Sequence, residues 1–232
     1  MKNNLSDKHD DRVVLVSFRR SGLNWVRYCI ELFSNKRTPG KLRLIKFGYP
    51  IIQRTHDVDC FDLEQYRDID RYKNRDIHGY EGCNFYDEEG RQVFSKMVLL
   101  LRDYRESYVR AAKMDKSRMS EYVSNLKAYH NFAGDKILVR YEDLIKDFSE
   151  MEKILDFIKI KRSSKKFDLE CHRKKSIAKY DKTNKSYTKD NVLDFSYHAK
   201  TLDQKQIDEI DMYMEEITPK DVYNEYLRSY RI

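Results

Sequence analysis

Four short apolar runs constrain the fold of this chain most, because three of them lead directly into helical patterns. The runs are 13–18 (VVLVSF), 49–55 (YPIIQRT), 96–101 (KMVLLL) and 136–140 (KILVR). Runs of this length that are rich in aliphatic residues are typical of buried strands, and buried parallel strands read as continuous rather than alternating apolar sequence. The pattern predicts an α/β fold with a central parallel sheet flanked by helices.

Apolar residues spaced three or four apart predict the helices. They fall in segments that begin at Leu23 and near Tyr104, and in the ranges of about 118–131, 142–158 and 207–217. With 232 residues, the chain has the length of one domain. We therefore expect a flexible N-terminus over 1–11 and a single domain over 12–232.

The charge balance favours an anionic partner. The chain has 46 Lys and Arg against 39 Asp and Glu, a net charge of +7 and a pI near 9.0. Nucleic acid, acidic lipid or a phosphorylated small molecule would each suit this charge, and solubility alone explains it equally well. No apolar run approaches the roughly 20 residues that cross a bilayer, and the start lacks a signal-peptide pattern. A cytoplasmic protein with no membrane partner is expected, with its four scattered cysteines reduced.

Polar residues follow every predicted strand. RRSG follows the first strand, His56 the second, Arg102 the third and Tyr141 the fourth. Ligands of open parallel sheets bind beyond the carboxyl ends of the strands. These groups are therefore expected to share one site.

The loop SFRRSGLNW, residues 17–25, is a candidate anion cradle. Gly22 lets the backbone approach a ligand, and the first amides of the following helix lack partners within the helix and point towards an anion. The predicted donors and charges are those of Arg19, Arg20, Ser21, Gly22, Leu23, Asn24 and Trp25. An ordinary turn with surface arginines remains the alternative, because one glycine in a turn is weak evidence.

Other nucleotide and catalytic motifs are absent. The only Gly-Lys pair, Gly40-Lys41, lacks the first glycine and the Ser or Thr of a Walker A motif. The sequence also has no GxGxxG, HExxH, GxSxG or metal-type Cys/His cluster. This argues against the usual ATPases, dehydrogenases, hydrolases and zinc enzymes, and no metal is expected.

SFRRSGLNW resembles the 5′-phosphosulfate loop of the sulfotransferases that use 3′-phosphoadenosine 5′-phosphosulfate (PAPS). That loop is usually written (S/T)-(Y/F)-P-(K/R)-S-G-(T/N)-T-W. The segment 54–56 (RTH) resembles the family's K-T-H, 96–102 resembles the strand that ends in its 3′-phosphate arginine, and 139–144 (VRYEDL) resembles its YEDL segment. The four segments occur in the family's order and cover about residues 13–160.

The resemblance implies a P-loop-like sulfotransferase with PAPS as co-substrate and a small molecule or glycan as acceptor. A hydroxyl, or less readily an amine, would receive the sulfuryl group. His56 would be the general base, with Asp57 available to orient its ring. Arg20 would stabilise the charge on the departing phosphate.

The resemblance also implies the rest of the donor site. Arg102 would bind the 3′-phosphate, Tyr141 would reach the adenine and Trp25 would stack on it. Arg110 stands where the family usually has a serine, and adds a charge there. Arg102 could instead pair with Asp103 or Glu106, and both aromatic residues could be core.

Several departures and alternatives remain. Arg19 replaces the family's proline, Leu23-Asn24 removes a hydroxyl, and the late R-K-G segment is unrecognisable, with 186–189 (SYTK) the nearest candidate. An inactive relative, a P-loop-like small-molecule kinase, and a basic nucleic-acid-binding module that stacks bases on its tyrosines are the alternatives. Nucleic acid is the less expected partner.

Overall fold

The computed structural model describes residues 13–39, 44–45, 51–59, 94–160 and 197–231. The expected N-terminal tail and the candidate segment 186–189 lie outside the described residues, as do Cys60, Cys83 and Cys171. The fourth cysteine, Cys29, is a buried free thiol.

Four strands form one parallel sheet, as predicted. They are β1 (Val13–Ser17), β2 (Gln53–Thr55), β3 (Lys96–Leu101) and β4 (Asp135–Arg140), in the order β2-β1-β3-β4. All three strand pairs are parallel. Of the strand expected over 49–55, residues 53–55 form β2 and pair with β1, whereas residues 51–52 lie outside the strand and residues 49–50 lie outside the described part of the chain.

Both faces of the sheet are buried, which explains why its strands read as continuous apolar sequence. Val14 and Val16 of β1 belong to one core, whereas Val13 and Leu15 belong to the core on the opposite face. Strand β3 alternates in the same way. Each buried side chain of this size contributes about 1.5–3 kcal/mol of transfer free energy, so both helical layers stabilise the sheet.

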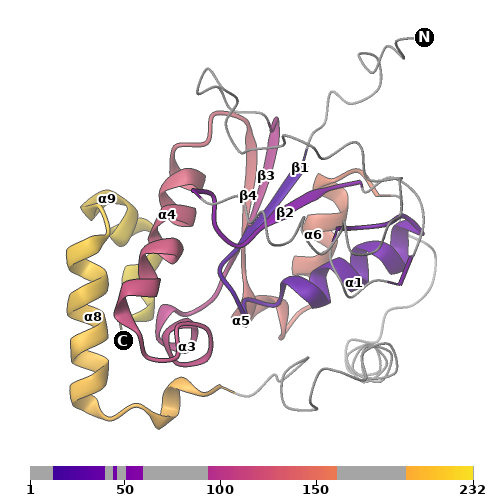
Figure 1. Ribbon diagram of the computed structural model, residues 1–232. Helices are drawn as coiled ribbons and strands as arrows, with labels where there is room; N and C mark the ends of the chain where they lie inside the picture. The colour runs from indigo at the N-terminus through magenta and orange to yellow at the C-terminus, as the bar shows by residue number, and fades with distance from the viewer. Residues whose placement is uncertain (1–12, 40–43, 46–50, 60–93, 161–196, 232) are drawn as a thin grey trace, which may run out of the picture.

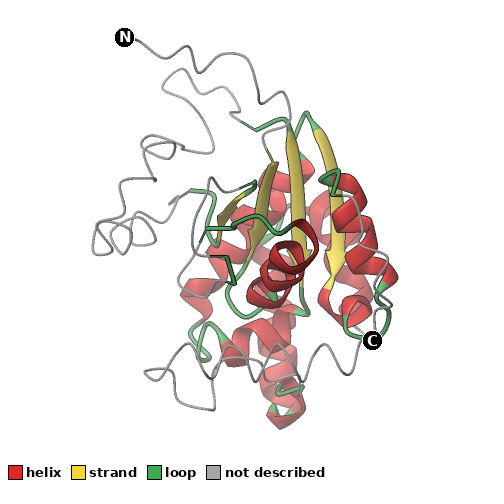
Figure 2. Ribbon diagram, turned by 90° about the vertical axis from the view of Figure 1, so that its right-hand side faces the viewer, coloured by secondary structure: helices red, strands yellow, loops and turns green. Residues whose placement is uncertain are grey.

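Helices α1 (Leu23–Ser34) and α6 (Ser149–Phe157) cover one face. Helices α3 (Tyr104–Arg110), α4 (Met119–His130) and α8 (Gln204–Ile217) cover the other. Figure 1 shows these two layers on either side of the sheet, and Figure 2 shows the strands running side by side between helices. Shorter elements complete the described chain: η2 (Lys116–Arg118), α5 (Tyr141–Leu144), η4 (Ala199–Thr201), α9 (Lys220–Val222), η5 (Tyr223–Leu227) and η6 (Arg228–Tyr230).

The single helix predicted over 142–158 is wrong, because the structure divides it into α5 and α6. The break lies at Asp147, whose carboxylate accepts hydrogen bonds from the amide and hydroxyl of Ser149 at 3.0 Å and 2.7 Å. An aspartate that bonds to the backbone two residues later favours a turn over a continuing helix. The apolar stripe continues across this turn, and periodicity alone therefore did not reveal it.

The C-terminal segment, defined here as residues 197–231, packs on α3 and α4. Asp211 of α8 accepts hydrogen bonds from the Tyr104 hydroxyl at 2.8 Å and from two nitrogens of Arg105 at 2.8 Å and 2.6 Å. Tyr226 meets Tyr129 edge to face, with ring centroids 5.8 Å apart. Apolar and charged contacts together hold this segment against the β3–α3 side of the molecule.

Candidate functional site

The groups that follow the four strands come together at the carboxyl edge of the sheet. This edge faces the bottom of Figure 1. His56 contacts Ser17 at the end of β1, and Arg102 contacts both Arg20 and the ring of Tyr141. The parallel arrangement therefore joins residues that are far apart in the sequence into one candidate site.

The loop between β1 and α1, residues 19–22, has an unusual backbone. Arg20 has φ 69° and Gly22 has φ 87°, both in the left-handed region. A left-handed conformation costs a residue with a side chain about 1–2 kcal/mol, so the rest of the site must hold Arg20 in place. Successive residues that alternate between right-handed and left-handed conformations direct their backbone amides into a concavity that can bind an anion.

The loop exposes charge and buries a hydroxyl. The side chains of Arg19 and Arg20 are exposed, whereas Ser21 is fully buried. The Ser21 hydroxyl has no hydrogen-bond partner among the described residues. A buried hydroxyl without a partner is costly unless a ligand or water satisfies it. This serine therefore fits a ligand-binding loop better than an ordinary turn.

The first turn of α1 uses part of its own donor capacity. The amide of Trp25 donates to the Gly22 carbonyl at 2.9 Å, so this one of the three predicted amide donors is already used inside the protein. The Asn24 side chain accepts from Arg27 at 3.1 Å. The Trp25 side chain is fully buried in the core beside α1, which is the structural alternative to stacking on a base.

His56 is held in one tautomer. Its Nδ1 lies 2.9 Å from the Ser17 carbonyl oxygen and 3.4 Å from the Ser17 hydroxyl. A carbonyl can only accept, so Nδ1 carries a hydrogen, and in the neutral ring Nε2 therefore carries the lone pair. This is the state that a general base requires. The Ser17 carbonyl thus orients the ring, and the Asp57 carboxylate accepts from the Asp59 amide at 3.0 Å.

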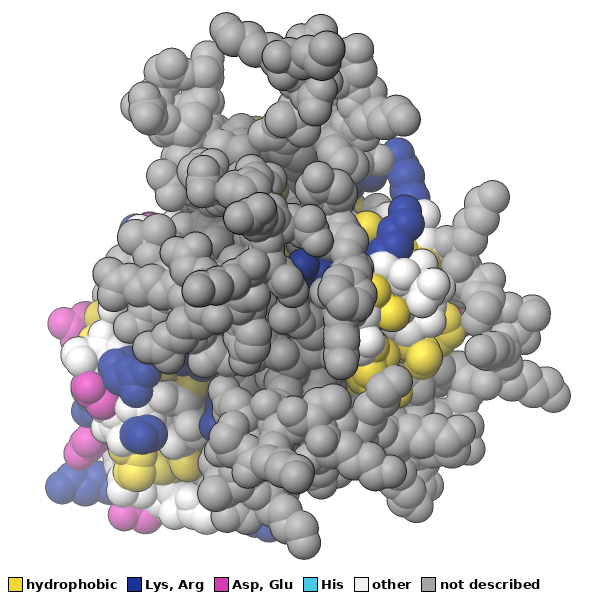
Figure 3. Space-filling model, turned by 45° about the vertical axis from the view of Figure 1, so that its right-hand side comes forward, with side chains coloured by type: hydrophobic (Ala, Val, Ile, Leu, Met, Phe, Trp, Pro, Cys, Tyr) yellow, Lys and Arg dark blue, Asp and Glu magenta, His cyan; other side chains and the backbone are white. Residues whose placement is uncertain are grey.

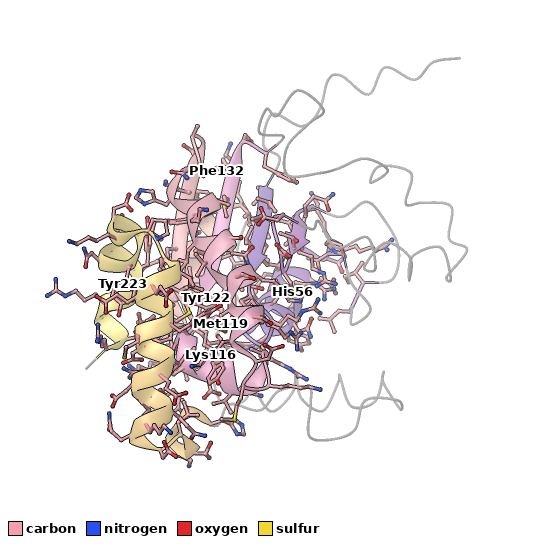
Figure 4. The ribbon with its side chains drawn as sticks, turned by 60° about the vertical axis from the view of Figure 1, so that its left-hand side comes forward. His56, Lys116, Met119, Tyr122, Phe132 and Tyr223 are labelled. Atoms are coloured by element: carbon pink, nitrogen blue, oxygen red, sulfur yellow. The ribbon has the colours of Figure 1, made fainter. Side chains whose placement is uncertain are left out.

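Asn125 of α4 supports the His56 segment and was missed by sequence reasoning. Its side chain donates to the His56 carbonyl at 2.7 Å and accepts from the Val58 amide at 3.1 Å. The only sequence signal was a polar residue adjoining the apolar stripe of a predicted helix. Figure 4 shows His56 on the strand side of the molecule and Tyr223 among the C-terminal helices.

Arg102 connects three of the four strand ends. Its side chain is only 3% exposed; it donates to the Arg20 carbonyl at 2.7 Å and to Glu106 at 3.0 Å. The guanidinium lies 4.0 Å from the Tyr141 ring centroid, and burial lowers the pKa of Arg102. The ion pair with Glu106, which the sequence offered as the alternative to phosphate binding, is present and buried.

Tyr141 is buried between Arg102 and the loop. An ideal Cβ at position 22 would lie 2.7 Å from Cδ2 of Tyr141, a distance that real Cβ contacts do not reach. Gly22 is therefore required both by its left-handed backbone and by this close approach. Tyr141 supports the shape of the loop, which is the core role that the sequence left open beside a contact with adenine.

Arg110 lies near the same carboxylate as Arg102. Its guanidinium is 3.7 Å from Oε1 of Glu106. Ser107, on the same helix, is fully buried, and its hydroxyl has no hydrogen-bond partner among the described residues. The β3–α3 junction thus combines the guanidinium groups of Arg102 and Arg110 with the buried carboxylate of Glu106 and the Ser107 hydroxyl.

Two buried carboxylates next to this site bind the C-terminal segment. Asp103 accepts from the Tyr197 hydroxyl at 2.6 Å and caps α3 by accepting from the Arg105 amide at 2.8 Å. Glu142 accepts from the Asp103 amide at 3.0 Å and from the Tyr230 hydroxyl at 3.1 Å. Burial raises the pKa of both carboxyl groups.

This burial predicts a pH dependence of stability. The folded protein binds protons at Asp103 and Glu142 more tightly than the unfolded chain, whose values lie near 3.8 and 4.5. Their contribution to stability is therefore full below about pH 4 and falls as the pH rises through the raised values. Urea unfolding of the wild type and of the Asp103→Asn/Glu142→Gln double variant should show the wild type gaining relative stability from about pH 7 down to about pH 4. A difference that stays constant over this range would contradict the prediction.

The surface and composition of the described residues add three findings. On the face of the molecule drawn in Figure 3, Lys and Arg side chains of the described residues lie at several separate places. Among the described residues, no group of three or more His, Cys, Asp or Glu could hold a metal ion. No helix in the described part of the chain is both long and apolar enough to span a bilayer.

The fold and site define an α/β protein with a four-stranded parallel sheet between helices and a basic, partly buried site at its carboxyl edge. No protein-family model and no curated protein matches the sequence. The assignment of an activity therefore depends on the chemistry of the site.

Proposed function

We propose that this protein is a PAPS-dependent sulfotransferase of P-loop-like architecture. It would transfer a sulfuryl group to a hydroxyl, or less readily an amine, of a small molecule or glycan. The observation that carries the proposal is the hydrogen bond of 2.9 Å between His56 and Ser17. This bond places a histidine of basic tautomer beside the first residue of the candidate anion loop.

The donor side of the proposal rests on the loop and the arginines around it. The backbone of alternating hand and the buried Ser21 hydroxyl suit the 5′-phosphosulfate. During transfer the bond between sulfur and the bridging oxygen breaks, and negative charge grows on that oxygen, which stays with the phosphate. Arg20 is always cationic and would stabilise that charge electrostatically rather than as a proton donor. Arg102 and Arg110 would bind the 3′-phosphate.

The acceptor side depends on His56. As the acceptor oxygen attacks sulfur, its proton would pass to Nε2 while Nδ1 keeps its bond to Ser17. The new bond joins sulfur to the acceptor, the old bond to the phosphate oxygen breaks, and adenosine 3′,5′-bisphosphate departs. In-line transfer of this kind depends mainly on positioning and charge neutralisation.

Two measurements test the function. Adenosine 3′,5′-bisphosphate should protect the protein from thermal unfolding, by about 2.7 kcal/mol at a hundred times its dissociation constant, whereas ATP should protect little. Radiolabelled sulfate from PAPS should then pass to members of a panel of alcohols, phenols, amines and sugars. Protection by ATP with phosphorylation of an acceptor would support the kinase instead. Tight nucleic-acid binding with a steep salt dependence, and no transfer, would support the binding module.

A further inference from the structure

Glu106 is a buried carboxylate that contacts four donors from three parts of the chain. Its side chain has no exposed surface. Oε1 lies 3.0 Å from Arg102 and 3.7 Å from Arg110. Oε2 accepts from the backbone amides of His198 and Ala199 at 2.6 Å and 2.7 Å.

The two amides fix the orientation of the carboxylate. They come from the start of the C-terminal segment, and both meet the same oxygen atom. The plane of the Glu106 carboxylate is therefore set by backbone atoms, and Oε1 is directed towards the two guanidinium groups. A buried charge satisfied in this way is much more rigid than an exposed ion pair.

Through Arg102 this orientation reaches the loop. One terminal nitrogen of Arg102 donates a hydrogen bond to Glu106, and the other donates to the Arg20 carbonyl. If the carboxylate lost its position, Arg102 would lose one of these two hydrogen bonds, which help to hold its guanidinium beside the loop. The series of contacts thus runs from the C-terminal segment through Glu106 and Arg102 to Arg20.

We infer that Glu106 is a positioning residue that orients Arg102 and Arg110 for binding the 3′-phosphate of the donor. This inference rests on the function proposed above, and Glu106 itself touches no substrate. It also explains why a negative charge lies inside a site that binds an anion. By simple electrostatics this charge opposes binding, and the orientation that it gives the two arginines would offset that cost.

The direction in which nucleotide affinity changes separates a positioning role of Glu106 from simple neutralisation of the arginines. Glu106→Gln removes a negative charge but keeps the size and shape of the side chain. If Glu106 only neutralised the arginines, the variant would bind adenosine 3′,5′-bisphosphate more tightly. As a positioning residue, it should give binding about tenfold weaker or more, because charge-assisted hydrogen bonds lose their geometry.

The experiment uses calorimetric titration of the full chain at fixed ionic strength with adenosine 3′,5′-bisphosphate and with AMP, which lacks the 3′-phosphate. The variant should lose most of the preference for the bisphosphate, whereas its affinity for AMP should change little. Unchanged or tighter binding of the bisphosphate, or an equal loss for both nucleotides, would overturn the inference. No binding of either nucleotide by the wild type would instead overturn the proposed function, and the inference with it.

Asp211→Asn is the matched control. Asp211 is also a buried carboxylate that joins α3 to the C-terminal segment, but it binds Arg105 and Tyr104 rather than the two arginines proposed to bind the phosphate. This variant should lose stability and keep its nucleotide preference; loss of the preference would overturn a specific role for Glu106. If Glu106→Gln fails to fold, Glu106→Asp keeps the charge but shortens its reach. It should also lose the preference, and retention would overturn the inference.

Discussion

Replacement of His56 by alanine is expected to lower sulfuryl transfer by about 10²–10⁴-fold, while adenosine 3′,5′-bisphosphate continues to bind. The imidazole lies 2.9 Å from Ser17, and its Nε2 carries the lone pair that would accept the acceptor proton. Its removal takes away the proposed base but should leave the loop 19–22, Arg102 and Tyr141 in place. The loss should therefore appear in kcat and not in the dissociation constant of the nucleotide.

The control is another histidine with polar neighbours. His130 of α4 lies 3.3 Å from both Asp221 and Glu225, at the C-terminal helices. His130→Ala should leave transfer near the wild-type rate. Steady-state kinetics with PAPS and calorimetric binding of the product provide the comparison. Transfer retained by His56→Ala would remove this residue from the mechanism, and lost nucleotide binding would show that it shapes the donor site instead.

Replacement of Gly22 by alanine is expected to have the largest effect on the loop. The added Cβ must occupy a left-handed backbone with φ 87° and would approach Tyr141 to 2.7 Å. The backbone alone costs about 1–2 kcal/mol, and the steric contact adds to it unless the loop moves. We expect lower stability together with a loss of affinity for adenosine 3′,5′-bisphosphate of more than tenfold.

A double-mutant cycle separates the two causes. In a Tyr141→Ala background the contact is relieved, so Gly22→Ala should cost only its backbone contribution. Urea unfolding and nucleotide titration of the four proteins give the coupling. Wild-type stability and affinity in Gly22→Ala would contradict the loop conformation described here.

The sheet and the convergence of its carboxyl ends could be predicted because each depends on local patterns. Strand β3 is apolar at nearly every position since both of its faces are buried. The positions of Arg102 and Tyr141 then follow from parallel strand direction. The Gly22 requirement was visible as a glycine between a strand and a helix, although its close contact with Tyr141 was not.

The rest depends on contacts between distant residues, which one sequence does not encode locally. Glu106 looked like a surface ion-pair partner, because nothing near it in the sequence indicates the amides of His198 and Ala199. Asn125 supports His56 across 69 residues. The break at Asp147 was hidden because apolar spacing continues across it. Burial of Trp25 is consistent with its place on an apolar helix face, and the pattern could not separate core packing from stacking on a base.

The two hydrophobic clusters on opposite faces of the sheet form the two halves of the core. They are completed at different stages of protein synthesis. Among the described residues, the half beside α1 and α6 draws its buried side chains from Val13 to Leu155, whereas the half beside α4 also includes Val222, Tyr223, Tyr226 and Leu227. A ribosome works from the N-terminus, so the described buried residues of the first half are all synthesised while the second half still exposes apolar side chains of β3 and α4. Large chains that fold in this order pass through states prone to aggregation. During synthesis the α4 face is therefore the part of the described core that stays exposed longest, until residue 227 has left the exit tunnel.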